Sequence, residues 1–312
     1  MDQWRYSLGT DKLSATVEIA KRVYSLAQEQ NDAALMLGAY RSLAATLYLS
    51  GDFETAGQNA RHGVQIWRSG AVQLQIEEII APAVACLCYE ALSEWHSGKV
   101  TSCHATMEKA LSLAKDLHDT QALVLALFWS AWLAHFEGNP AEVERLASAV
   151  IEISLRQNFA LWLPVGVVLR GWACSVSGNT AKGISWIGEG IDDYRVTGSI
   201  LTIPFSLTLK AEALHLADRT SEALEAIKDA EALVERFQGR AWYVELYRLR
   251  GVFLTAIGAD EAQIEASFCE AIRTAKEQKS VSLAKRAEAS YAEYRRKKAS
   301  ALRGHGFRIP LW

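Results

Sequence analysis

Small turn residues recur in this chain at a nearly constant interval, and that spacing constrains its fold more than any other feature. They are Gly9, Gly51, Gly98, Gly138, Gly178, Asp218 and Gly258, and the last five lie 40 residues apart. A fixed period of roughly 20–50 residues is typical of one supersecondary unit copied along a chain, each copy burying its apolar face against its neighbours. The spacing therefore predicts a repeat array, a class that usually presents an extended surface to a partner.

The segments between these turn residues have helical patterning. Apolar residues recur at three- and four-residue steps, good helix formers fill the other positions, and strand signals are scarce. Each repeat is predicted to contain a helix A, a tight turn and a helix B, as in 33–50, 51–52 and 53–67. The turn residues suit the left-handed conformation that ends many helices. We therefore predict an all-α fold, a right-handed α-solenoid of helix-turn-helix repeats.

The repeats predict one solenoid domain over residues 1–298 and a non-repeat tail at 299–312. The predicted units are a half repeat at 1–30, full repeats at about 31–79, 80–119, 120–159, 160–199, 200–239 and 240–279, and a half repeat at 280–298. The 47-residue step from Gly51 to Gly98 places an insertion near 69–78. Because both ends are half repeats without polar caps, we expect a piece of a longer array, with self-association through the bare ends.

Small residues stand at two fixed distances from the turns. Seven residues before the turn residue, six repeats carry Ala or Gly, and five residues after it most repeats carry a small or compact residue. Gln263 breaks the second series, which predicts a shifted helix B in the last full repeat. Small residues at both positions let helices A and B cross closely. Replacing Gly171 or Ala131 with Leu should therefore overpack the crossing and cost about 1–3 kcal/mol or more.

Composition favours a folded interaction protein over several other classes. Half of the 312 residues are hydrophobic and the formal net charge is −3, with one short basic run at 295–298, so we expect no nucleic-acid partner. Residues 1–10 show no basic region followed by an apolar one, and no stretch reaches roughly 18 apolar residues, so we expect a cytoplasmic protein without a membrane partner. Five cysteines without paired spacing predict reduced, buried thiols.

Motifs for catalysis, cofactors and metals are weak. The segment 178–183 contains Gly and Lys but lacks the phosphate-binding loop pattern, and it coincides with an inter-helix turn. Cys86, Cys88 and Cys103 have no matching second pair for zinc. Ser175 and His135 lack a nucleophile-elbow motif. We therefore predict no enzyme activity, no cofactor and no metal site in this chain.

One face of helix A is the best candidate for a binding site. Positions ten, six and three residues before each turn residue share an arc at about 100° per residue, and they need no partner within a repeat. We expect this arc to line a concave solvent groove that binds a protein, a peptide or a small effector. Trp and Arg are typical of binding hot spots, although the Trp rings have the alternative role of filling gaps between repeats. The candidate residues are Arg41, Tyr48, Trp95, Phe128, Trp132, His135, Trp172, Glu212, His215 and Arg248.

The Gly-Asp-Phe-x-x-Ala run at 51–56, with Ala44 before it, resembles a tetratricopeptide repeat (TPR), whose usual period is about 34 residues. Longer stretches, among them 123–135, 169–173 and 245–251, are similar to the C-terminal helical-repeat region of large bacterial predicted ATPases. In that family a class III nucleotide cyclase domain or a winged-helix DNA-binding domain precedes an AAA/STAND-type ATPase module.

This resemblance covers roughly residues 61–298 and implies a sensor or scaffold region of a signalling regulator. The catalytic parts of the family are absent from the chain. Two alternatives remain open: an effector-sensing repeat domain of a transcriptional regulator, and a truncated remnant of a larger ATPase gene.

Overall fold

The computed structural model describes residues 2–10, 12–70, 72, 80–301 and 311 of the chain. Within them are fifteen α-helices, one short 3-10 helix and no strand, which confirms the predicted all-α repeat fold. The helices are α1 (Asp2–Thr10), α2 (Leu13–Gln30), α3 (Ala33–Leu49), α4 (Phe53–Arg68), α5 (Pro82–His96), α6 (Val100–Asp116), α7 (Thr120–Phe136), α8 (Pro140–Gln157), α9 (Trp162–Val176), α10 (Thr180–Val196), α11 (Ile203–Leu216), α12 (Thr220–Phe237), η1 (Arg240–Trp242), α13 (Tyr243–Ala256), α14 (Glu261–Glu277) and α15 (Val281–Ala301).

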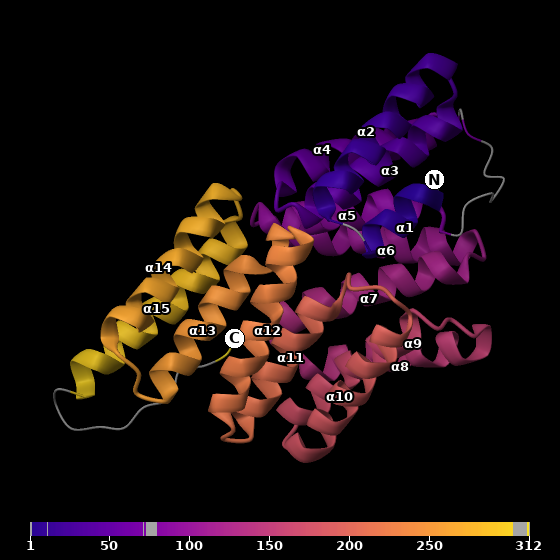
Figure 1. Cartoon of the computed structure of the whole chain (residues 1–312). Coiled ribbons are helices and arrows are strands. Elements are labelled where there is room, and N and C mark those ends of the chain that lie inside the picture. The colour runs from indigo at the N-terminus through magenta and orange to yellow at the C-terminus, as the bar shows by residue number, and fades with distance from the viewer. Residues whose placement is uncertain (1, 11, 71, 73–79, 302–310, 312) are drawn as a thin grey trace.

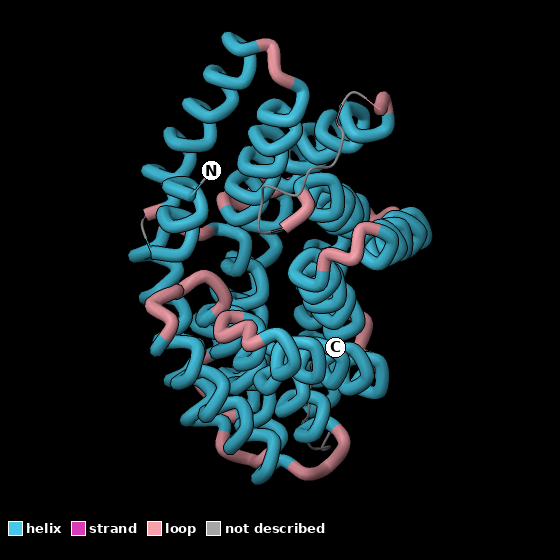
Figure 2. Tube along the Cα trace, turned by 90° about the vertical axis from the view of Figure 1, so that its right-hand side faces the viewer, coloured by secondary structure: helices cyan, strands magenta, loops and turns pink. Residues whose placement is uncertain are grey.

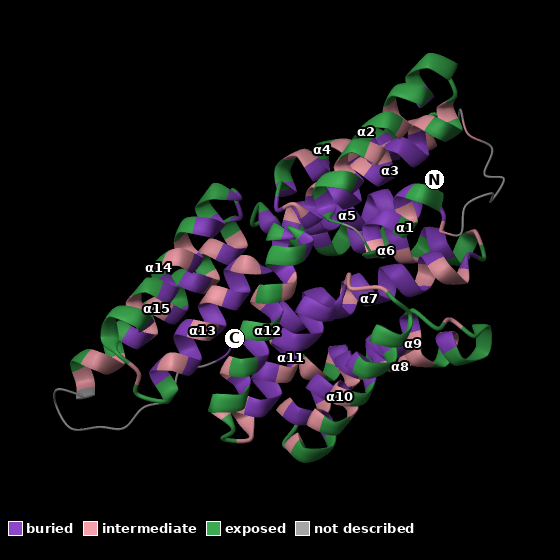
Figure 3. Ribbon diagram, in the orientation of Figure 1, coloured by how far each residue is buried: buried purple, intermediate pink, exposed green. Residues whose placement is uncertain are grey.

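Consecutive helices form antiparallel pairs that follow one another along a curved path, from the indigo N-terminal end to the yellow C-terminal end (Figure 1). The A helices α3, α5, α7, α9, α11 and α13 also contact the next A helix along the chain, so they form a continuous inner layer. Figure 3 shows that buried residues concentrate on this layer, whereas the B helices expose their outer faces.

The predicted turns lie where the spacing placed them, with one exception. Gly51, Gly98, Gly138, Gly178, Gly258 and Asp218 all have positive φ. At the first of these, the amide of Gly51 donates to the carbonyl of Tyr48 at 2.9 Å and that of Asp52 to Leu47 at 3.0 Å, a Schellman motif that ends α3. The Asp52 side chain then accepts from the amide of Thr55 and begins α4. Gly9 is the exception, because it lies inside α1 and forms no turn.

The small-residue positions mark close helix crossings, as predicted. A Cβ atom added to Gly183 on α10 would lie 2.3 Å from the carbonyl oxygen of Gly171 on α9. In the last full repeat α14 begins at Glu261, one residue later than its counterparts relative to the turn, and Ile264 is buried there in place of Gln263. The predicted shift of this helix is therefore confirmed.

The solenoid curls so tightly that distant repeats touch (Figure 2). The imidazole Nδ1 of His96 at the end of α5 lies 2.8 Å from the hydroxyl of Ser280, 184 residues away. Lys279 forms an ion pair with Glu54, with Nζ and Oε2 separated by 2.6 Å. The inner layer is therefore enclosed by the chain itself.

Several details differ from the predicted pattern. The last helix, α15, continues to Ala301 instead of turning near 298, and Leu311 is buried. Most of the predicted insertion at 69–78 lies outside the described residues. Three cysteines are buried, but Cys174 is half-buried and Cys269 is exposed, so the prediction of uniformly buried thiols is wrong. No helix in the described part of the chain combines the length and apolarity needed to cross a membrane.

Candidate ligand cavity inside the superhelix

The predicted binding arc points inward, but it does not face solvent. Nine of the ten candidate side chains belong to residues that are at most 5% exposed, and His215 is half-buried. The expectation of an open groove along this arc is therefore wrong. The large apolar side chains of the arc contact one another because the tight curl brings successive A helices together. Burial of their aromatic surface favours this closed arrangement. The buried residues are Arg41, Tyr48, Trp95, Phe128, Trp132, His135, Trp172, Glu212 and Arg248.

An aromatic cluster surrounds His96 beside its contact with Ser280. The ring of His96 stacks on that of Phe53, with centroids 3.5 Å apart and planes inclined by 5°. Its Nε2 lies 3.3 Å from the hydroxyl of Tyr48, while Trp95 packs edge-on against the same imidazole. Burial lowers the pKa of His96 well below its usual value. The imidazole is therefore neutral, as its apolar surroundings require.

A buried ionic network joins the central A helices. The carboxylate of Glu212 on α11 accepts from the indole Nε1 of Trp172 at 2.5 Å and lies 3.1 Å from the imidazole Nε2 of His135. Burial raises the pKa of Glu212, but the charges of His135, Arg248 and Arg286 outweigh that effect and lower it overall. Glu212 is therefore ionised at neutral pH and holds three A helices together.

Next to Glu212 lies a cavity of about 10 Å³ between α7, α11 and α13. Four of the polar atoms around it have no hydrogen-bond partner among the described residues: Trp132 Nε1, His135 Nδ1, Glu212 Oε1 and Trp242 Nε1. A site of this size and polarity suits a single water molecule and is too small for an organic ligand. These predicted residues therefore form part of the structural interior.

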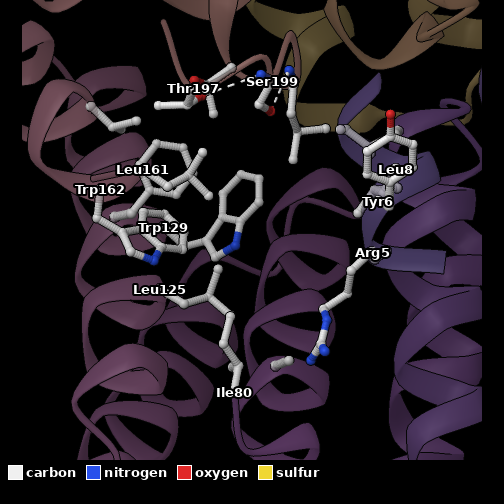
Figure 4. A pocket seen from close by; sticks show the side chains of 18 of the residues that line it. Arg5, Tyr6, Leu8, Ile80, Leu125, Trp129, Leu161, Trp162, Thr197 and Ser199 are labelled. Atoms are coloured by element: carbon white, nitrogen blue, oxygen red, sulfur yellow. Dashed lines mark hydrogen bonds between the residues drawn. The ribbon is translucent and has the colours of Figure 1, made fainter. Parts of the chain in front are cut away.

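A larger cavity of about 340 Å³ lies between α1 and the inner layer (Figure 4). Its walls come from α1, from the A helices α3, α5, α7 and α9, from the loop at 197–202 and from Trp242 of η1. Only Arg41 and Phe128 of the predicted residues line it. The lining is mainly apolar and aromatic, and the volume falls in the usual range for small-molecule sites. This cavity is the best candidate for a ligand site in the described structure.

Helix α1 forms one wall of the cavity because its sequence is amphipathic. Trp4 and Leu8 are one helical turn apart and both are buried. The indole Nε1 of Trp4 donates to the hydroxyl of Thr46 on α3 at 3.0 Å. At the other end of α1, the carbonyl of Gly9 accepts from the amide of Ile200 at 2.9 Å. The short helix therefore bridges the first repeat and the loop before α11.

Figure 4 shows Trp129 and Trp162 on one side of the cavity and Arg5 and Tyr6 on the other. Sequence reasoning missed all four residues. The spacing of Trp4 and Leu8 was a sequence signal for an amphipathic α1. Trp129 directly follows Phe128 in the chain and so lies outside the predicted arc of α7. Which side of a helix faces a cavity depends on the curl of the whole array, and no local pattern encodes that curl.

Cations border this cavity. Arg41 is buried, lies over the ring of Trp4 with its guanidinium carbon 5.4 Å from the centroid, and donates to the carbonyl of Ile80 at 3.5 Å. Arg5 on α1 is paired with Asp2 at the surface. No group of three or more His, Cys, Asp or Glu side chains suited to a metal ion occurs within the described part of the chain.

Comparison with known proteins gives one distant sequence relative and several structures of similar fold. No family model matches the chain. An uncharacterized protein of Rhizobium meliloti (strain 1021) is 21% identical over 203 residues, which are 65% of this chain and 20% of that protein. The chain therefore matches about a fifth of the length of this relative.

Among solved structures, Bacillus thuringiensis PlcR in complex with the peptide PapR7 and DNA is similar over 93% of this chain and 100% of its own, with 14% identity and a TM-score of 0.52. A Podosopora anserina kinesin light chain with nearly identical TPR-like repeats matches 65% of this chain and 96% of its own, at 14% identity and a TM-score of 0.43. The likeness to PlcR supports the helical-repeat fold seen in the structure.

Proposed function

We propose that this chain is a non-catalytic sensor module that binds an apolar ligand in the 340 Å³ cavity and reports its occupancy to a protein partner. One observation carries the proposal: the cavity walls come from segments as distant as Trp4 and Trp242. A ligand that contacts all of these segments would stabilise their arrangement relative to the empty state, since binding to one conformation shifts the population toward it.

Helix α1 is the element best placed to respond. It is only nine residues long and touches the rest of the array through Trp4, Leu8 and a few hydrogen bonds. Short helices of this kind are marginal on their own, so their position depends on the tertiary contacts around them. Ligand binding against α1 would therefore change how firmly it is held.

Two comparisons support a regulatory context. PlcR, whose fold resembles this one along nearly the whole chain, was solved with a peptide and DNA. The match to a fifth of the Rhizobium meliloti protein is consistent with a repeat module that also occurs within longer proteins. Together with the resemblance to ATPase- and cyclase-type regulators, these likenesses favour a sensor region of a signalling or transcriptional regulator.

The proposal is tested by binding of a neutral apolar fluorophore, N-phenyl-1-naphthylamine, to the full chain. Val165 lines the cavity, and Val165→Phe fills part of it, so fluorescence enhancement should fall at least fivefold. Val196→Phe is the matched control, because Val196 is 87% exposed and lies outside the cavity. Equal enhancement in both variants, with unchanged helix content, would refute a ligand site here.

A further inference from the structure

Among the described residues, the charged side chains on the cavity wall are all basic. The described residues that line it include two arginines, Arg5 and Arg41, and no Asp or Glu. Figure 4 places the guanidinium of Arg5 toward Ile80, whose carbonyl accepts the hydrogen bond from Arg41. The two cations therefore lie toward the same end of a mainly apolar cavity. Positive charge in a low-dielectric surrounding favours an anionic group at that end.

Two donors at the cavity have no hydrogen-bond partner within the described part of the chain. The Nη1 atom of Arg5 is buried and makes no hydrogen bond, while its Nη2 contacts Asp2 at the surface. The indole Nε1 of Trp129 is also buried without a partner, and the Trp129 residue is 5% exposed. A buried donor without an acceptor is costly, so the free Nη1 of Arg5 suits a ligand that brings an acceptor to it.

We propose that the cavity takes a small amphiphile with one carboxylate and an apolar body, such as a medium-chain fatty acid. The carboxylate accepts from Nη1 of Arg5 and lies in the field of Arg41, and the apolar body packs against Phe128 and Trp162. A single carboxylate can accept from the Nη1 atom that Asp2 leaves free, whereas a doubly charged group would lose more on leaving water. This inference rests on the proposed function, because it names the ligand of the same cavity.

A way into the cavity is present at its rim. Tyr6 is 71% exposed, Leu161 is 38% exposed, and both line the cavity together with the exposed Thr197. A ligand can therefore pass between α1 and the two loops that precede α9 and α11. The enclosed volume suits a compact molecule and not an extended peptide, which would need a continuous groove.

The test compares decanoate with decanol, a neutral molecule of the same chain length, by isothermal titration calorimetry on the full chain. Decanoate should bind at least tenfold more tightly than decanol. Arg5→Met should remove that advantage and leave decanol binding unchanged, because a hydrogen bond to a charged group is typically worth a factor of ten or more. Arg22→Met, an exposed cation on α2 outside the cavity, is the matched control and should change neither affinity.

Arg5→Lys keeps the charge without the fork and should weaken decanoate binding less than Arg5→Met does. Equal binding of decanoate and decanol to the unaltered chain, or no effect of Arg5→Met in a protein with unchanged helix content, would overturn the carboxylate assignment and leave the apolar cavity site standing. Failure of decanoate, decanol and the naphthylamine alike to bind would overturn the ligand site itself.

Discussion

The close crossing of α9 and α10 gives a prediction in which the same substitution has opposite effects at two positions of one helix. Gly183 and Gly188 both lie in α10. A Cβ atom at Gly183 would lie 2.0 Å from the hydroxyl oxygen of Ser175, 2.3 Å from the carbonyl oxygen of Gly171 and 2.9 Å from the amide nitrogen of Ser175. A Cβ atom at Gly188 meets nothing within 4 Å. Gly183→Ala therefore has to push α9 and α10 apart, and Gly188→Ala does not.

The expected magnitudes follow from these distances. Alanine in a helix interior is more stable than glycine by about 0.5–1 kcal/mol, so Gly188→Ala should raise the free energy of unfolding by that amount. At Gly183 the clash with backbone atoms exceeds this gain, and overpacking costs of about 1–3 kcal/mol or more give a net loss. Urea unfolding followed by circular dichroism should show midpoints shifted in opposite directions. Midpoints that shift together would refute the claim that this crossing sets the packing of the two helices.

Three further predictions concern buried groups. Burial raises the pKa of Glu245, but the charges of Arg248 and Arg286 outweigh burial and lower the pKa from 4.5 to about 2. About 3 kcal/mol of folding stability should therefore be present above pH 4.5 and be lost as the pH falls toward 2. Acid unfolding of Glu245→Gln should show a weaker dependence of stability on pH in that range. Burial lowers the pKa of His96, so this imidazole takes up a proton more readily in the unfolded chain. The free energy of unfolding should therefore fall as the pH drops below about 6.5. In urea titrations at pH 7 and pH 5, His96→Gln should reduce this difference in stability. With a thiol-reactive disulfide reagent, the exposed Cys269 should react fast, whereas Cys88 should react only on unfolding. Cys88 is buried, and burial raises the pKa of its thiol. Equal reaction rates for the two thiols would contradict these burial assignments.

Much of the local architecture could be predicted from the sequence. The 40-residue spacing places the turns, because only residues that tolerate positive φ end these helices without strain. The small residues at Gly171 and Gly183 indicate close crossings, because no larger side chain fits between the backbones. The disruption at Gln263 likewise indicates the later start of α14. These features are local, and each depends on a few neighbouring residues.

The candidate site was harder to predict, because it depends on the curl of the whole array. Angle counting correctly groups Trp132 and His135 on one face, but it does not show whether that face meets solvent or other repeats. The answer depends on contacts such as His96 with Ser280, which join residues 184 positions apart. Small changes in the angle between successive repeats add up over the array. The total curvature therefore cannot be predicted from the sequence of any single repeat. The cavity against α1 arises from the same closure.

The central claim is that the solenoid closes on itself, so that its inner face is an interior and not an open groove. Carbodiimide, which joins amines to carboxylates in direct contact, tests this claim through Lys279 and Glu54, whose Nζ and Oε2 atoms lie 2.6 Å apart although the residues are 225 positions apart. Lys298 and Glu261, an ion pair between the sequential helices α14 and α15, serve as the positive control. Mass spectrometry of the digested monomer should find both cross-linked peptides. Recovery of the control link without the link between Lys279 and Glu54 would contradict the closed superhelix.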